Sequence, residues 1–252
     1  MSEMVLSVNG VAKHFGGVIA LKNVNLALGK HEILGLIGPN GSGKTTLVNM
    51  ISGFLKPTKG DFVANGKPIA GLPPHRVAHS GVTRTFQNLR VFRRRTVLEN
   101  VMVGQITRVS GLELFLPFAT ARRDMRYEQA MGLLDRFGLA DKADNIAGAL
   151  SFGDQKRLEL ARAMACKPDI LLLDEPAGGM NPSEIEELKA TLREMRDEGL
   201  SILLIEHNMR LVMSVCDRIA VLCFGEIIMD GKPEDVRVHP EVIRSYLGHG
   251  GA

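Results

Sequence analysis

A glycine-rich segment at residues 38–46, GPNGSGKTT, has the residue types that bind phosphate groups. It follows the apolar stretch EILGLI at 32–37 and opens a stretch with helical spacing, TTLVNMISG. In the pattern G-x-x-x-x-G-K-T, glycines let backbone N–H groups surround the phosphates, the lysine reaches the β- and γ-phosphates, and the threonine hydroxyl binds Mg²⁺. Strand, turn and helix in this order predict a nucleotide site. Its predicted residues are Gly38, Pro39, Asn40, Gly41, Ser42, Gly43, Lys44, Thr45 and Thr46, with Thr45 also on the metal.

Two adjacent carboxylates end the apolar stretch ILLLDEP at 170–176. Successive strand residues point to opposite sides, so Asp174 and Glu175 cannot bind a metal ion in the same way. We expect Asp174 to hold Mg²⁺ through water and Glu175 to face an attacking water molecule. Phosphoryl transfer to water depends on positioning and charge neutralisation, and a carboxylate beside the water orients it and can act as a base. The pair therefore predicts hydrolysis of the bound nucleotide.

A second helix start, ALSFGDQKRLELARA at 149–163, has a first turn suited to holding a ligand. Ser151 and Asp154 fit a capping box, and Gly153 lets a ligand approach the backbone. The N–H groups of a helix N-terminus suit phosphate, whereas Asp154 places a carboxylate at the same point. Nothing nearby in the sequence supplies a phosphate, so the residues alone leave the ligand of this turn open.

Two further polar residues have weaker patterns. His207 follows the strand-like stretch SILLIE at 201–206, and strand ends at one edge of a parallel sheet gather around a ligand. A single histidine at such a position is nevertheless more often structural. Gln87, in RTFQNL, has no distinguishing pattern of its own.

The elements that must position these residues are short apolar strands between helical stretches. Continuous apolar runs occur at 32–37, 169–174, 201–206 and 218–223. Strands buried on both faces have this pattern, so we predict an α/β class with a mostly parallel sheet covered by helices. The first 30 residues alternate instead, as in MVLSV and NVNLAL, which predicts a small antiparallel sheet attached to the core.

Strand patterns fade from about Leu89 to Met164, where helical periods dominate. A separate helical lobe inserted into the α/β core explains this change better than a long loop. Inside it, the apolar stretch LELFLPFA at 112–119 fits either core packing or a docking surface for a partner.

Composition narrows the class of protein. The chain has 252 residues, 45% hydrophobic and 23% charged, enough for a full core. A net charge of +3, spread along the chain, argues against a nucleic-acid partner.

The cysteines, Cys166, Cys216 and Cys223, lack metal-ligand spacing and indicate a reducing compartment. MSEMVLSVNG lacks the pattern of a signal peptide, and no apolar run reaches the about 18 residues of a membrane span, so we expect neither secretion nor a membrane crossing.

The motifs together resemble those of ATP-binding cassette ATPases, and the resemblance covers nearly the whole chain. It implies that Glu175, His207 and Gln87 act in ATP hydrolysis, with Gln87 also on Mg²⁺. Phe15, in KHFGGVIAL, is similar to the aromatic residue that stacks on adenine, although a core phenylalanine is the alternative. The motifs that carry the resemblance are 38–45, Gln87, LSFGD at 150–154, ILLLDE at 170–175, AGGMN at 177–181 and His207.

The same resemblance implies a domain organisation and a shared site. One cassette domain would span 1–252, with a P-loop NTPase core at 1–87 and 167–252 and a helical signature lobe at 88–166. Two cassettes would pack head to tail, so that the signature of each contacts the ATP bound to the other. The implied signature contacts are Ser151, Phe152, Gly153 and Asp154. Cassettes usually have glutamine where this chain has Asp154, and the alternative is that Asp154 only caps its helix.

A finer resemblance is to the ATPase subunits of branched-chain (hydrophobic) amino-acid importers. Segments such as IEHNMRLVM, CDRIAVL and VIRSYLG carry it. It implies a second ATPase subunit, identical or a sister chain, two transmembrane permease subunits and, indirectly, a solute-binding protein, with this chain on the cytoplasmic face of the membrane. Arg93, Arg94 and Arg95 would then lie near the permease, or else form a solvated basic face. A cassette ATPase of lipid export or a soluble regulator is the alternative function.

Overall fold

The computed structural model describes residues 3–85, 91–106 and 119–247. The chain divides into two compact units. The first contains Met1–Arg84, Asp169–Ala177 and Asn181–Ala252, and the second contains Thr85–Pro168 and Gly178–Met180. Three residues of the AGGMN motif thus group with the second unit.

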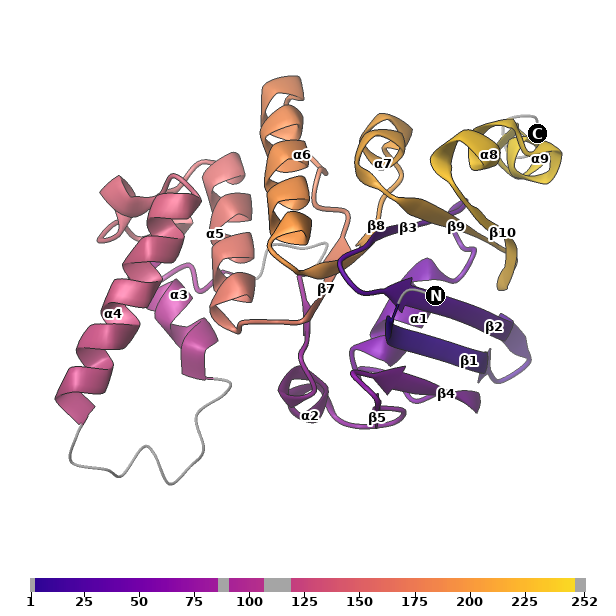
Figure 1. Ribbon diagram of the computed structural model, residues 1–252, viewed down its shortest axis with the longest axis horizontal. Helices are drawn as coiled ribbons and strands as arrows, with labels where there is room; N and C mark the ends of the chain where they lie inside the picture. The colour runs from indigo at the N-terminus through magenta and orange to yellow at the C-terminus, as the bar shows by residue number, and fades with distance from the viewer. Residues whose placement is uncertain (1–2, 86–90, 107–118, 248–252) are drawn as a thin grey trace. The chain divides into compact units, whose positions relative to one another are not determined.

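The first unit is built on a six-stranded sheet in the order β10-β9-β3-β8-β7-β6 (Figure 1). Neighbouring strands are parallel except β10, which pairs antiparallel with β9. Every residue of β3, β7 and β8 is buried, as expected for strands covered on both faces. The predicted parallel sheet is therefore confirmed, although β6 and β10 were not predicted. The strands are β3 (Ile33–Ile37), β6 (Val82–Arg84), β7 (Ile170–Asp174), β8 (Ser201–Ile205), β9 (Arg218–Cys223) and β10 (Glu226–Gly231).

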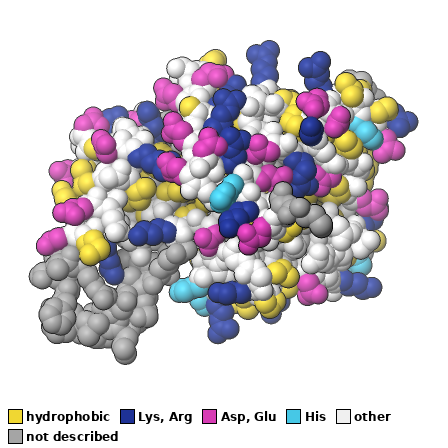
Figure 2. All heavy atoms as spheres, in the orientation of Figure 1, with side chains coloured by type: hydrophobic (Ala, Val, Ile, Leu, Met, Phe, Trp, Pro, Cys, Tyr) yellow, Lys and Arg dark blue, Asp and Glu magenta, His cyan; other side chains and the backbone are white. Residues whose placement is uncertain are grey.

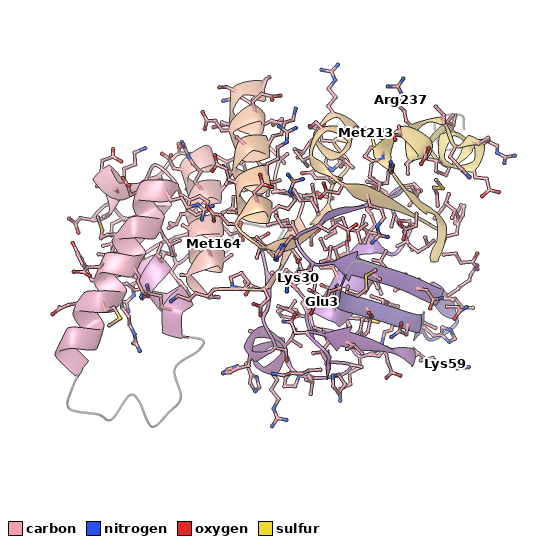
Figure 3. The ribbon with its side chains drawn as sticks, viewed as in Figure 1. Glu3, Lys30, Lys59, Met164, Met213 and Arg237 are labelled. Atoms are coloured by element: carbon pink, nitrogen blue, oxygen red, sulfur yellow. The ribbon has the colours of Figure 1, made fainter. Side chains whose placement is uncertain are left out.

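A four-stranded antiparallel sheet in the order β2-β1-β4-β5 forms the rest of the strand structure, as predicted for the start of the chain. Figure 3 labels Lys30 and Glu3, which lie together where β2 ends and β1 begins; their side chains form an ion pair of 3.1 Å. Residues of both sheets and of α1 (Lys44–Ile51) share one apolar core that includes Leu6, Phe62 and Leu203. The strands are β1 (Met4–Phe15), β2 (Val18–Gly29), β4 (Lys59–Ala64) and β5 (Lys67–Pro68).

The remaining helices of the first unit follow its strands along the chain. Asn181 and Glu184 form a capping box at the start of α6, the best-capped of these helices. On the face seen in Figure 2, Lys and Arg side chains are interspersed with Asp and Glu over the helices. The helices are α2 (Pro74–His79), α6 (Pro182–Asp197), α7 (Met209–Val215), α8 (Pro233–Val238) and α9 (Pro240–Leu247).

The second unit is helical in the residues described. Helix α3 (Val97–Ile106) packs against both α4 (Ala119–Arg136) and α5 (Phe152–Ala165). A side chain at Gly104 would approach the Arg162 carbonyl oxygen to 2.5 Å, so glycine lets α3 and α5 lie close together. Short 3₁₀ turns at Ala140–Lys142 and Ala147–Ala149 lead into α5. The predicted apolar stretch at 112–119 lies, apart from Ala119, outside the described residues.

The cysteines are free, with Cys216 and Cys223 buried and Cys166 half-buried. Burial raises the pKa of the Cys216 thiol, which keeps this side chain protonated and unreactive. Among the described residues, no helix has the length and apolar character needed to cross a membrane.

Candidate functional site

The loop between β3 and α1 has the backbone conformation of a phosphate cradle. Gly38 and Gly43 have φ of 152° and 110°. A Cβ at Gly38 would lie 1.9 Å from the Leu222 carbonyl oxygen, and one at Gly43 would lie 2.6 Å from a Leu21 methyl carbon. Only glycine fits at both positions, because other residues would be strained in φ and would clash.

The first turn of α1 is open to an anion. Gly43 precedes the helix, no side chain caps it, and its first turn has no acidic residue. The Ser42 Oγ is buried and has no hydrogen-bond partner among the described residues. Free N–H groups at a helix start, beside a buried hydroxyl without a partner, are what a nucleotide phosphate would satisfy.

Lys44 is folded back onto the loop that precedes it. Its Nζ donates hydrogen bonds to the carbonyl oxygens of Gly38 at 2.7 Å and Pro39 at 3.0 Å. Burial lowers the pKa of Lys44, although the negative charges of Glu175 and Asp174 raise it. Because β3 and β7 are both parallel neighbours of β8, the glycine loop that leads to Lys44 and the Asp174–Glu175 pair leave the sheet at the same edge.

Asp174 forms a buried ion pair that the sequence analysis missed. The Arg84 Nη2 lies 2.7 Å from the Asp174 Oδ2, and both side chains are about 5% exposed. The Arg84 Nη1 also donates to the Asn49 Oδ1 at 2.6 Å and to the Ser52 Oγ at 3.1 Å. Arg84 thus anchors Asp174 to the end of α1, the helix that begins at the glycine loop.

Glu175 and His207 come together at the ends of neighbouring strands. The Glu175 N–H donates to the Ile205 carbonyl at 2.9 Å, extending the pairing of β7 with β8 by one residue. Its φ of 51° is unusual for a residue with a side chain. The His207 Nδ1 lies 3.8 Å from the Glu175 Oε1, and the histidine side chain is 67% exposed. The strand-end placement puts both groups at one edge of the sheet, open to a ligand.

Two other predicted residues have different outcomes. Phe15 is 47% exposed at the end of β1, with the Lys13 Nζ 5.0 Å from the centre of its ring, so it is not a core phenylalanine. Gln87 lies outside the described residues.

The signature segment starts α5 with a side-chain cap. The Ser151 Oγ accepts a hydrogen bond from the Asp154 N–H at 3.2 Å. The Asp154 carboxylate pairs with Lys142 and with Arg157, each at 2.8 Å. Burial raises the pKa of Asp154, but the hydrogen bonds from Lys142 and Ser151 and the charges of Lys142 and Arg157 bring it below its usual value. The Asp154 carboxylate is therefore paired with cationic side chains of its own unit.

Phe152, the next signature residue, lies against the AGGMN motif. It is 47% exposed, and its ring is 2.8 Å from where a Cβ of Gly179 would stand. The Lys156 Nζ lies 5.8 Å from the ring centre on the same helix. Arg93, Arg94 and Arg95 are exposed in the same unit, where Arg95 forms a 3.2 Å ion pair with Glu99.

The comparison with protein families gives two matches. Residues 21–178 match the family described as "ABC transporter". Residues 226–252 match a family described as "Branched-chain amino acid ATP-binding cassette transporter". The first match includes the glycine loop, the signature segment and the Asp174–Glu175 pair.

Curated relatives match over nearly their full length. The high-affinity branched-chain amino acid transport ATP-binding protein LivG of Escherichia coli K12 is 46% identical, over 98% of this chain and 99% of the relative. The corresponding protein BraF of Pseudomonas aeruginosa is 44% identical over the same shares. The lipopolysaccharide export system ATP-binding protein LptB of Haemophilus influenzae is 36% identical, over 97% of each.

Solved structures match the fold. The ADP conformation of MJ1267, an ATP-binding cassette of an ABC transporter, has a TM-score of 0.85 and 32% identity, covering 98% of this chain and all of that one. A nucleotide-free cassette has a TM-score of 0.85, covering 96% of this chain and 98% of that one.

Proposed function

The chain belongs to the ABC transporter family, and we propose that it is the ATP-hydrolysing subunit of an importer for branched-chain or related amino acids. The proposal of an amino-acid cargo is supported by the relatives LivG and BraF and by the match of residues 226–252. The proposal of hydrolysis depends most on one observation: Glu175 and His207 lie 3.8 Å apart where β7 and β8 end, and the glycine loop that leads to Lys44 begins where the neighbouring parallel strand β3 ends.

The proposed binding step uses the glycine loop and α1. The N–H groups at the start of α1 and the ammonium of Lys44 bind the phosphates, and Phe15 stacks on adenine. Thr45, Asp174 and Gln87 would hold Mg²⁺ through oxygen atoms, with Asp174 acting through a water molecule. When bound, Mg²⁺ neutralises charge on the phosphates.

The proposed hydrolytic step uses the pair at the ends of β7 and β8. Glu175 orients the attacking water and accepts its proton, while His207 lies beside the carboxylate at 3.8 Å. Neither group needs covalent contact with the nucleotide, because hydrolysis requires mainly position and charge.

The proposed transport cycle requires a second cassette. Ser151, Phe152, Gly153 and Asp154 would close on the γ-phosphate of ATP held by the partner, and the binding energy of closure would move two permease subunits between outward and inward states. A solute-binding protein would deliver the amino acid, and this chain would lie on the cytoplasmic face of the membrane. Hydrolysis would then release the pair.

Two variants that are each inactive test the shared site. Lys44→Ala removes the phosphate ammonium, and Ser151→Arg fills the signature with bulk and charge. A mixed pair contains one site that joins the intact loop of one chain to the intact signature of the other. We expect mixing to restore part of the ATPase activity, with a rate that depends on both concentrations. Each variant alone is the control, and membrane subunits can hold two chains together. Absence of rescue in an assembled transporter that contains both variants contradicts the shared site.

The relative LptB supports a second candidate, the ATPase of a lipid exporter. Purification of the assembled complex from its native membrane distinguishes the two. A solute-binding protein that carries an amino acid supports import, whereas bound lipopolysaccharide supports export.

A further inference from the structure

Glu206 is a buried acid between β8 and His207. It is 1% exposed. Its Oε1 accepts a hydrogen bond from the Ala177 N–H at 2.8 Å, and its Oε2 accepts from the N–H groups of His207 at 3.1 Å and Asn208 at 3.2 Å. All three hydrogen bonds come from backbone N–H groups, so they fix the backbone conformation of the segments that contain Ala177, His207 and Asn208.

These donors belong to two different loops. Ala177 lies two residues after Glu175 in the loop after β7, and His207 and Asn208 lie in the loop after β8. Strands β7 and β8 lie side by side (Figure 1). In their parallel pairing Asp174 is opposite Ile205. One carboxylate therefore fastens both loops at the edge of the sheet where Glu175 and His207 lie 3.8 Å apart.

Two features of these loops need such support. Glu175 has a φ of 51°, a conformation that the surrounding structure must impose. His207 is exposed, so packing of its side chain does little to fix it. Asn208, held by Glu206, in turn caps α7 by accepting the Leu211 N–H at 3.2 Å.

We propose that Glu206 is a positioning residue for hydrolysis, which sets the backbones of Glu175 and His207 relative to each other without touching the nucleotide. The inference rests on the proposed roles of these two residues. A carboxylate suits the task because both of its oxygens accept hydrogen bonds. Glutamine has one acceptor oxygen, and its NH₂ group would face an N–H group on the other side.

Glu206→Gln tests the proposal. We expect kcat for ATP hydrolysis to fall about 10- to 100-fold, with KM and ATP affinity within about threefold, because geometry at the water is lost and phosphate binding is kept. Amide hydrogen exchange at Ala177, His207 and Asn208 should become faster. Unchanged exchange at these positions, or faster exchange with normal kcat, overturns the proposal.

Glu184→Gln is the matched control. The Glu184 Oε2 accepts one backbone N–H, from Asn181, in the capping box of α6. Glutamine also serves at that position of a capping box, so kcat should stay within about twofold. Glu206→Asp, which keeps the charge but shortens the reach, gives the same readouts if the glutamine variant does not fold. Faster exchange with normal kcat in the folded Asp variant overturns the proposal.

A background without either positioned group separates positioning from general weakening of the fold. In a Glu175→Gln/His207→Ala background, Glu206→Gln should lower kcat by less than about threefold, because both groups that it positions are gone. A full additional loss overturns the proposal. If Glu175→Gln keeps near-normal turnover, the proposed function fails instead; normal turnover in Glu206→Gln alone, with Glu175→Gln impaired, overturns only this inference.

Discussion

Helices α1 and α5 both begin with a turn that could hold an anion, but the two turns are occupied differently. The turn of α1 has glycine before it, no side-chain cap and no acid. The turn of α5 has Ser151 as its cap and Asp154 within it. One helix start has N–H groups left for a ligand, whereas the other satisfies part of its own backbone.

The charges beside these turns differ in the same way. Lys44 is hydrogen-bonded only to neutral carbonyl oxygens in the contacts described for it, and a phosphate would bind it more strongly. Asp154 already has two cationic partners, Lys142 and Arg157. Changes at the start of α1 should therefore alter ATP binding and turnover, whereas removal of the Asp154 carboxylate should alter mainly stability.

We expect the largest effect from a change at Arg84, because its side chain neutralises the buried charge of Asp174 near α1. Arg84→Met leaves Asp174 buried without its cation, and breaking such a pair lowers the free energy of unfolding by about 3–5 kcal/mol. Urea unfolding measures the change. The double variant Arg84→Met/Asp174→Leu, with both charges removed, should recover most of the stability. A loss below about 1 kcal/mol in the single variant would show that Asp174 does not depend on Arg84.

Glu175→Gln tests the prediction that changes near α1 alter turnover or ATP binding. We expect turnover to fall by about two to three orders of magnitude with ATP affinity kept, because the water loses its orienting carboxylate and the phosphate cradle remains. Lys44→Ala, by comparison, should weaken ATP binding. Equilibrium binding and single-turnover rates check both variants, and near-normal turnover in Glu175→Gln would remove Glu175 from its proposed role.

Gly179→Ala tests how the signature unit is packed. Gly179 has a φ of 77°, and an added methyl would meet the Phe152 ring at 2.8 Å. We expect a loss of about 1–3 kcal/mol in the free energy of unfolding, from strain in φ and from overpacking.

The double variant Gly179→Ala/Phe152→Ala should recover only the part due to the ring. Gly132→Ala is the control, because Gly132 lies in α4 with nothing within 4 Å of an added methyl. Equal losses at both glycines would show that Phe152 does not restrict Gly179.

The strands and the strand-end groups were predictable because their signals are local and repeated. Continuous apolar runs marked β3, β7, β8 and β9, and parallel strands bring their ends together whatever the loops do. Arg84 and Glu206 were not found. Strand β6 has only three residues, too few for a pattern, so nothing marked Arg84 as the partner of a carboxylate 90 positions away.

Other misses come from tertiary contacts that no spacing encodes. Glu206 ended an apolar run and was taken as part of the strand, although its donors come from two loops. The capping pattern of Ser151 and Asp154 predicted the bond from the Asp154 N–H, but the carboxylate is drawn to Lys142 and Arg157. Local pattern predicts which element a polar residue starts or ends, and long-range packing decides what its side chain binds.

Asp154→Asn should have the smallest effect and tests the α5 side of the contrast. In the folded protein, burial raises the pKa of Asp154. Lys142, Ser151 and Arg157 together lower it by more than burial raises it, so the pKa of the folded state is below the unfolded value. The ionised carboxylate therefore adds stability above the unfolded pKa of about 4, and this is lost as pH falls through the folded value. We expect the variant to be less stable by about 1 kcal/mol at pH 7, because the cationic partners are partly exposed and solvent weakens the pairs. The difference from wild type should shrink below about pH 4.

Asp144→Asn removes the same charge from an exposed position and is the control for net charge. Urea unfolding between about pH 2 and pH 7 gives the stabilities on both sides of the unfolded pKa. ATPase activity of Asp154→Gln should change within about fivefold if the carboxylate only stabilises its own unit. A loss beyond about a hundredfold in ATPase, with stability kept, would show that Asp154 acts on the nucleotide of a partner chain, and the two helix starts would then both be phosphate sites.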